Sequence, residues 1–321
     1  MNDLPPEAPN RPDPSPESQF GTLLRDLKAL PFNALFPFAD WLKAGLLGQP
    51  LTRTILLMAL FPLGIYYFLG QNASIQTSGW AFGVYFAAIW AYILHLMVRP
   101  ENIRWSTASG VAFFTTLVGI ATVLFVQKFP VISWLYAATE SPFSPLRLVG
   151  FILGVGVLEE AVKLAPVVYL VLKLREVKDL KQAAYYAGIS GLAFGVAEAV
   201  SYLYLLRLQD VGQLVYGGPL NNGSTIILQM VRLITLPFLH CMFSSIAGYY
   251  IGLSLYSREK HRAWIVFGIA LAAIIHGLYD FFSSSYLGIV VAAVTILLFA
   301  GYLYSSRNIT EQVESQKNMH V

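Results

Sequence analysis

Ionisable side chains occur inside segments that are apolar enough to cross a membrane. Glu159, Glu160 and Lys163 lie within a hydrophobic segment at about 146–172. An ionisable residue at bilayer depth costs about 2.5–3.5 kcal/mol on insertion scales. Two adjacent acids and a lysine that shares a helix face with them are therefore expected to form a functional site.

Three later apolar segments carry groups of the same kinds. Glu198 follows Phe194 by four residues, and each such pair shares one helix face. Asp280 follows His276 at the same spacing, and His240 lies in the segment between these pairs. Counting helical rise from the outer ends of the segments puts the polar groups roughly 10–20 Å below the outer surface. Tilted helices can therefore bring them level.

Carboxylates and imidazoles that meet inside a membrane can support hydrolysis in two ways. They can activate water by general-base catalysis, or they can bind a divalent metal such as Zn²⁺, which lowers the pKa of a bound water molecule to about 7. In both cases the depth of the groups implies that the substrate itself lies in the membrane. The candidate metal ligands are Glu160, Glu198, His240 and His276.

The composition is that of an integral membrane protein. Of the 321 residues, 56% are hydrophobic and 12% are charged, whereas a soluble domain has about 25% charged residues. The net charge of +3 is too small to suggest a nucleic-acid partner. The single cysteine, Cys241, excludes an internal disulfide and a cysteine-rich metal site. The expected partners are the lipid bilayer and a membrane-embedded protein substrate.

We expect an all-α, polytopic membrane protein with about eight transmembrane helices. A span needs about 20 mostly apolar residues. Segments of this kind recur along most of the chain, and no convincing internal repeat relates them to one another. The expected spans are 54–70, 79–98, 107–127, 146–172, 183–206, 227–256, 263–283 and 286–304.

The spans make up a transmembrane domain at 53–305, followed by a cytoplasmic tail at 306–321. Residues 1–19 are Pro-rich and polar, which predicts a disordered tail. Residues 20–52 are amphipathic, which predicts helices that lie in the membrane interface. With the N-terminus inside, 16 of the 21 Lys and Arg residues fall in cytoplasmic segments and 3 in outer segments. The positive-inside rule therefore predicts that both termini are cytoplasmic.

Together, the polar groups of four successive spans resemble the motifs of the PrsW family of intramembrane proteases. These motifs are Glu159-Glu160-x-x-Lys163, Phe194-x-x-x-Glu198, His240 and His276-x-x-x-Asp280. The resemblance covers about residues 146–285, the expected catalytic core. It implies an intramembrane endopeptidase in a bacterial cytoplasmic membrane, which makes a site-1-type cut in a single-pass membrane protein such as an anti-sigma factor.

Each motif residue has an expected role in such a protease. Glu159 or Glu160 is the expected general base, and the adjacent acid assists it. Lys163 is expected to set the ionisation of this pair. The other residues are expected to position the water, bind a metal, stabilise the oxyanion or support the site: Phe194, Glu198, His240, His276 and Asp280.

The sequence is also compatible with other functions. The related CAAX-prenyl-protein endopeptidases have Glu-Glu-x-x-x-Arg as their first motif and a second motif that ends in His, and here Lys163 and Glu198 replace those residues. A non-catalytic membrane-binding relative and a proton-coupled transporter are further alternatives, because buried acids and histidines also form proton relays. Gly188-Ile189-Ser190-Gly191 matches a rhomboid serine-protease pattern, but that chemistry leaves the intramembrane acids unexplained.

Overall fold

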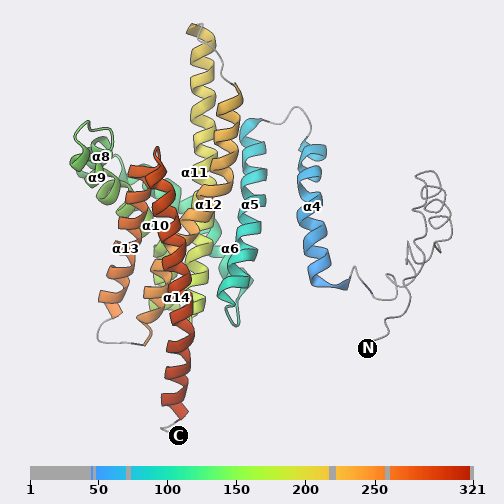
Figure 1. Ribbon diagram of the computed structural model, residues 1–321, viewed down its shortest axis with the longest axis vertical. Coiled ribbons are helices and arrows are strands. Elements are labelled where there is room, and N and C mark those ends of the chain that lie inside the picture. Colours follow the sequence, from blue (N-terminus) through green and yellow to red (C-terminus); the bar gives the residue numbers. More distant parts are fainter. Residues whose placement is uncertain (1–44, 46–47, 70–73, 217–221, 257–260, 319–321) are drawn as a thin grey trace, which may run out of the picture. The chain divides into compact units, whose positions relative to one another are not determined.

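The computed structural model describes residues 45, 48–69, 74–216, 222–256 and 261–318 (Figure 1). Within these ranges every regular element is a helix, which confirms the all-α prediction. The tail expected at 1–19 lies outside the described residues, and so do nearly all of the interfacial helices expected at 20–52.

The chain divides into two compact units, Met1–Leu60 and Phe61–Val321. The described part of the first unit is mainly the beginning of helix α4 (Pro50–Leu69). The second unit contains all the residues of the candidate site. Its elements are α5 (Ile75–Val98), α6 (Trp105–Phe113), η2 (Phe114–Gly119), α7 (Ile120–Val126), α8 (Pro130–Ala138), α9 (Ser144–Val149), η3 (Gly150–Gly156), α10 (Val157–Tyr169), η4 (Leu170–Leu174), α11 (Leu180–Tyr216), α12 (Asn222–Leu253), α13 (His261–Phe282) and α14 (Tyr286–Asn318).

Six helices of the described ranges are long and apolar enough to cross a membrane. They are Gln76–Val98, Trp105–Val126, Leu180–Tyr202, Met230–Leu253, Arg262–Phe282 and Tyr286–Ser306. The protein is therefore a polytopic membrane protein, as predicted, although the expected number of eight spans is not confirmed. The segment expected at 146–172 is helical throughout but carries charges, and the one expected at 54–70 contains a shorter apolar helix at Thr52–Gly64.

The helix ends follow local sequence signals. Ser74 caps α5, since its hydroxyl accepts a hydrogen bond of 3.1 Å from the backbone N–H of Thr77. Pro130 begins α8, where its missing N–H costs nothing. Arg175 ends η4 in the left-handed conformation, with φ of 53°. At the C-terminus α14 continues to Asn318, past the domain boundary expected at 305.

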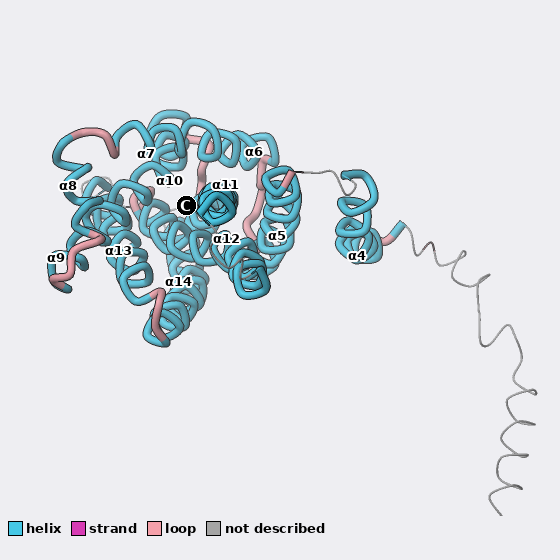
Figure 2. The backbone as a smooth tube through the Cα atoms, turned by 90° about the horizontal axis from the view of Figure 1, so that it is seen from above, coloured by secondary structure: helices cyan, strands magenta, loops and turns pink. Residues whose placement is uncertain are grey.

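Helices α11 and α12 lie side by side at the centre of the second unit, with α5 on one side and α13 on another (Figure 2). These helices approach one another closely because glycines lie at their contacts. A Cβ atom on Gly191 would collide with the backbone carbonyl oxygen of His240, and one on Gly195 would lie 2.6 Å from Cα of Pro237. Gly156 lies in the same way against the carbonyl oxygen of Ala273, which brings α10 against α13. Small residues thus allow polar side chains of several helices to converge.

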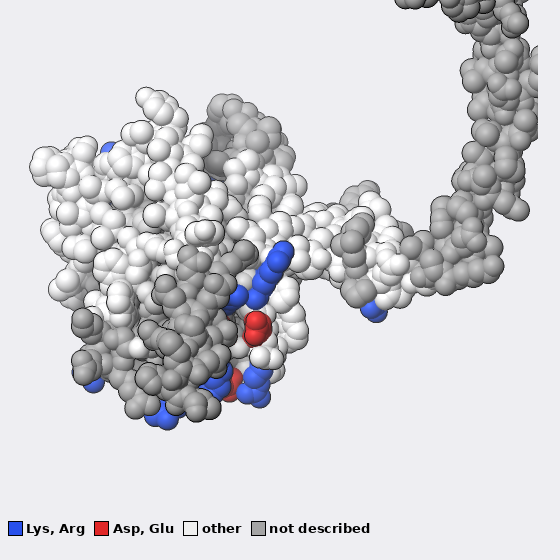
Figure 3. Space-filling model, turned by 60° about the horizontal axis from the view of Figure 1, so that its bottom comes forward, with Lys and Arg blue, Asp and Glu red and all other residues white. Residues whose placement is uncertain are grey.

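The outer surface of the second unit is largely apolar. Large hydrophobic side chains are exposed along its helices, among them Phe113, Leu117 and Leu297. A soluble protein rarely exposes so much contiguous apolar surface, whereas a bilayer solvates it. Figure 3 shows a mostly uncharged face, with Lys and Arg side chains gathered at the end that comes forward in that view.

Candidate active site

Four helices bring together all eight residues that the sequence motifs single out. Helix α10 carries the two glutamates and the lysine, α11 carries Phe194 and Glu198, α12 carries His240, and α13 carries His276 and Asp280. Direct contacts of the side chains, described below, connect Glu159, Glu160, Lys163, Phe194, Glu198, His240, His276 and Asp280.

Lys163 contacts residues of three helices, although it is fully buried. Its Nζ atom donates to Oε1 of Glu160 at 2.8 Å and lies 3.5 Å from Oε2 of Glu159. The same atom lies 2.6 Å from Nδ1 of His240 and 4.2 Å from the centre of the Phe194 ring. An ammonium group has no acceptor, so Nδ1 of His240 must accept this hydrogen bond.

This bond fixes the state of the His240 ring. Because Nδ1 accepts from Lys163, the ring hydrogen lies on Nε2, which is 2.7 Å from Oε2 of Glu198. Glu198 therefore accepts from His240. Nε2 can bind a metal only in the other tautomer, with the ring hydrogen on Nδ1 and the hydrogen bond from Lys163 given up.

Glu160 is buried and has a partner for each of its oxygens. Oε1 accepts from Lys163 and lies 3.0 Å from Nδ1 of His276, while Oε2 accepts from the Ser244 hydroxyl at 3.0 Å. A carboxylate on the Nδ1 side of a histidine orients the ring and leaves Nε2 available. Glu160 thus links α10, α12 and α13 from the inside of the site.

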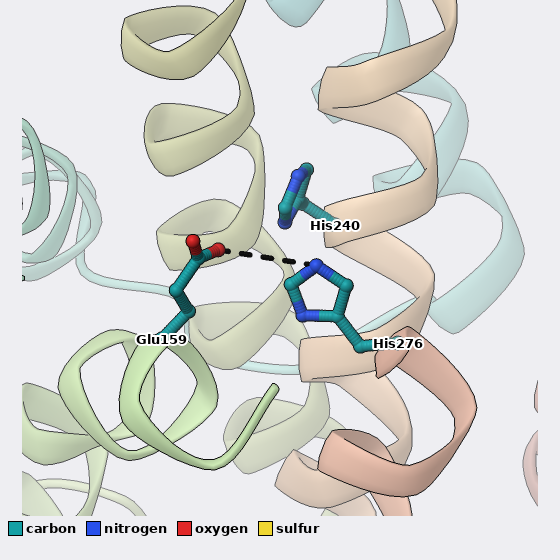
Figure 4. Close-up of side chains that lie close together, drawn as sticks. All are labelled: Glu159, His240 and His276. Carbon is teal, nitrogen blue, oxygen red and sulfur yellow. Dashed lines mark ion pairs between the residues drawn. The ribbon is translucent and has the colours of Figure 1, made fainter. Parts of the chain in front are cut away.

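Glu159 has a different environment from its neighbour. Its Oε2 atom is buried and makes no hydrogen bond to any described residue. It lies 3.9 Å from Nε2 of His276, which is itself 3.3 Å from Oδ2 of Asp280. Figure 4 shows the Glu159 carboxylate and the His276 ring pointing toward each other, with His240 next to them.

Glu159, His240 and His276 form a group that could hold a metal ion. One ligand atom from each lies within 4.8 Å of the others, and all three residues are buried. One carboxylate and two imidazoles suit zinc and other divalent transition metals. Glu159 Oε2, which makes no hydrogen bond to a described residue, and His276 Nε2, which lies 3.9 Å from it, are a donor set that fits a cation. The predicted ligand set of Glu160, Glu198, His240 and His276 shares its two histidines with this group. Glu160 itself contacts Lys163, Ser244 and His276.

A cavity of about 490 Å³ opens onto one side of this group. Four of its wall residues are acids: Glu140, Glu159, Glu198 and Asp280. Much of the remaining wall is apolar, with Ile120, Leu124 and other residues of α7, η3 and α11. Glu160 and Lys163 do not line this cavity. A bound segment would therefore meet Glu159, Glu198 and Asp280, and not the buried Lys163–Glu160 pair.

A family comparison agrees with this geometry. The model of the PrsW family of intramembrane metalloproteases matches residues 101–304. The chain belongs to the PrsW family. No curated protein and no solved structure shows a significant match.

Membership of the PrsW family confirms the resemblance seen in the motifs and makes the chain a protease. It also implies a membrane-embedded substrate and a lipid environment. The match begins at residue 101 and so includes α6 and α7 as well as the motif-bearing helices. The transporter and non-catalytic alternatives gain no support from this match.

Three hydroxyl groups contribute contacts around this PrsW site, and of these only Ser190 belongs to a sequence motif, the rhomboid-like one. Ser244 follows His240 by four residues on α12, so helical spacing alone could have found it. Ser190 donates to the backbone carbonyl of Lys163 at 2.6 Å, and Thr115 lies 2.6 Å from the same hydroxyl. Ser190 is fully buried and occupied in this way. It therefore has a structural role, which argues against rhomboid chemistry.

Proposed function

We propose that this PrsW protease cleaves a peptide bond of a single-pass membrane protein, such as an anti-sigma factor, in the outer half of a bacterial cytoplasmic membrane. The observation that carries the proposal is the cavity, because Glu159, Glu198 and Asp280 line it and Glu159 also belongs to the buried group with His240 and His276. An extended peptide segment with apolar side chains would match this wall, and its carbonyl would approach the acids.

We assign the metal site to Glu159, His240 and His276, with Zn²⁺ as the proposed ion. When bound, such a metal supplies a Lewis acid for the scissile carbonyl and lowers the pKa of water. Asp280 lies 3.3 Å from Nε2 of His276 and supports the orientation of that ring. Glu160 holds the other nitrogen of the ring.

Glu198 is the proposed general base. It lies on the cavity wall, and its side chain is 23% exposed, so it can reach both water and substrate. It takes a proton from the attacking water as the oxygen adds to the carbonyl carbon. It then gives the proton to the leaving amine as the C–N bond breaks. This assignment differs from the sequence-based one, which gave the base to Glu159 or Glu160.

Charge distribution supports the proposed orientation. The α5–α6 and η4–α11 connections carry the exposed residues Arg99, Arg104 and Lys178. By the positive-inside rule this end is cytoplasmic. The cavity is lined by residues at the opposite ends of the helices, such as Gln127 and Ser283. We therefore place the cavity on the outer side and both termini in the cytoplasm.

The test is cleavage of a panel of single-pass membrane proteins, anti-sigma factors included, by enzyme reconstituted in liposomes. Chelation should abolish cleavage, and added Zn²⁺ should restore it. His240→Ala and His276→Ala should lose bound metal, measured by mass spectrometry of the purified protein, together with activity. Glu198→Gln should keep the metal and lose cleavage.

A matched control is His95→Gln on α5. The His95 ring packs against Trp105 and Tyr185, and it is not part of the metal-binding group. This variant should keep both metal and cleavage. Cleavage by Glu198→Gln at the wild-type rate would remove Glu198 from the mechanism. Full metal content in both alanine variants would remove the proposed metal site.

A further inference from the structure

Tyr136 has a buried hydroxyl that makes no well-formed hydrogen bond to any residue the structure describes. The residue lies on α8, and its Oη atom is shielded from solvent and makes no hydrogen bond to any described residue. A buried polar group without a partner costs about 1–3 kcal/mol. Because such a group lowers the stability of the fold, its presence calls for a functional explanation.

Tyr136 lines the same cavity as the proposed catalytic acids. The cavity wall includes Tyr136 together with Glu159, Glu198 and Asp280. The hydroxyl-bearing side chain and these acids therefore face one common space. Gln127 is a further polar neighbour on this wall.

The position of Tyr136 is fixed by close packing of α8 against η3. A Cβ atom on Gly150 would lie 2.7 Å from the backbone nitrogen of Thr139, and one on Gly154 would lie 3.0 Å from Cβ of Leu135. The Thr139 hydroxyl also donates to the carbonyl oxygen of Tyr136 at 2.7 Å. Because η3 leads directly into α10, the packing of α8 on η3 positions Tyr136 relative to Glu159.

The hydroxyl is available as a donor. Burial raises the pKa of Tyr136 above its usual value, and the carboxylate of Glu159 raises it further. The group is therefore protonated at neutral pH. The aliphatic hydroxyls on the wall are already used, since Thr139, Ser201 and Ser283 each donate to a backbone carbonyl. The ammonium group of Lys163 is bound to Glu160 and His240 away from the cavity.

We propose that Tyr136 is a catalytic residue whose hydroxyl donates a hydrogen bond to the scissile carbonyl oxygen as it becomes an oxyanion. The hydroxyl keeps its proton throughout, and its bond strengthens as negative charge develops on the oxygen. Substrate thus supplies the partner that the free enzyme lacks. This inference rests on the proposed function, because it requires the scissile bond to enter this cavity.

The experiment is Tyr136→Phe, which removes one oxygen atom. Loss of one oxyanion donor typically lowers kcat about 10²–10³-fold, and we expect a loss near the lower end with KM changed less than about twofold. The Tm should not fall, because the deleted hydroxyl makes no hydrogen bond to any described residue of the free enzyme. Tyr169→Phe, at a half-exposed tyrosine of α10 outside this cavity, should leave kcat, KM and Tm unchanged.

Two results would overturn the inference. One is a kcat equal to that of wild type, and the other is a lower Tm, which would give the hydroxyl a structural role. Glu198→Gln is measured in parallel to separate this inference from the proposed function. If Glu198→Gln is inactive while Tyr136→Phe turns over normally, only the role of Tyr136 fails. If both variants cleave normally, the proposed site fails as well.

Discussion

Two adjacent glutamates with identical chemistry have different environments in this protein. Glu160 is fully buried and contacts Lys163, Ser244 and His276. Glu159 is next to it on the helix, yet its side chain is 10% exposed and lines the cavity, and its Oε2 atom makes no hydrogen bond to a described residue. One carboxylate is therefore a structural element of the helix bundle, and the other is available to a ligand.

Substitutions of the two glutamates should differ in their effects on stability and on cleavage. Glu160→Gln leaves the buried ammonium of Lys163 without its closest counter-charge, and removal of one partner of a buried ion pair costs about 3–5 kcal/mol. We expect a loss near the lower end, because Glu159 remains 3.5 Å from Nζ. Glu159→Gln should keep its stability within about 1 kcal/mol but lose metal and cleavage. Chemical unfolding in detergent and metal analysis measure both effects. Equal loss of stability in the two variants would contradict this division.

Sequence motifs predicted which residues come together, but they did not predict the different environments of the individual side chains. Spacing of four residues correctly placed His276 and Asp280 on one face, and Lys163 beside both glutamates. Which glutamate faces the cavity depends on the π-helical segment η3, because it changes the helical register ahead of α10. No apolar periodicity in the sequence marks such a change. Tyr136 also escaped prediction, because α8 carries no motif and reaches the site through tertiary packing.

At the scale of elements, glycine contacts determine how far the site residues lie apart. The backbone carbonyl of His240 lies directly against Gly191, so the α11–α12 distance sets the position of the histidine relative to Glu198. The sequence predicted close approach from the clustered glycines. It could not identify the partner atoms, since these depend on the rotation of each helix.

Gly191→Ala should therefore impair both folding and catalysis. The new methyl group would collide with the His240 carbonyl oxygen, and overpacking of this kind costs about 1–3 kcal/mol. Displacement of α12 should also lower the cleavage rate. Gly110→Ala on α6 is the matched control, because no atom lies within 4 Å of its added Cβ. That control should be neutral or slightly more stable, as alanine favours helix over glycine. A Gly191→Ala enzyme with wild-type stability and rate would refute the packing argument.

For the whole molecule, the direction from which a substrate enters the cavity depends on the side of the membrane on which the cavity opens. Charge counting predicts that the η4–α11 connection is cytoplasmic and that the α8–α9 turn is outside. The buried Cys241 is the protein's only cysteine and is 1% exposed. The native chain should therefore give little background with a thiol reagent, so that single introduced cysteines report on sidedness.

Two such cysteines decide the orientation. Glu140→Cys, in the exposed turn after α8, should react with a membrane-impermeant maleimide on intact cells. Lys178→Cys, exposed between η4 and α11, should react only after the membrane is permeabilised. Cys241→Ser in each background removes the residual native signal. The reverse labelling pattern would open the cavity toward the cytoplasm, and a substrate entering from the inner leaflet would then replace the outer cleavage proposed for this protease.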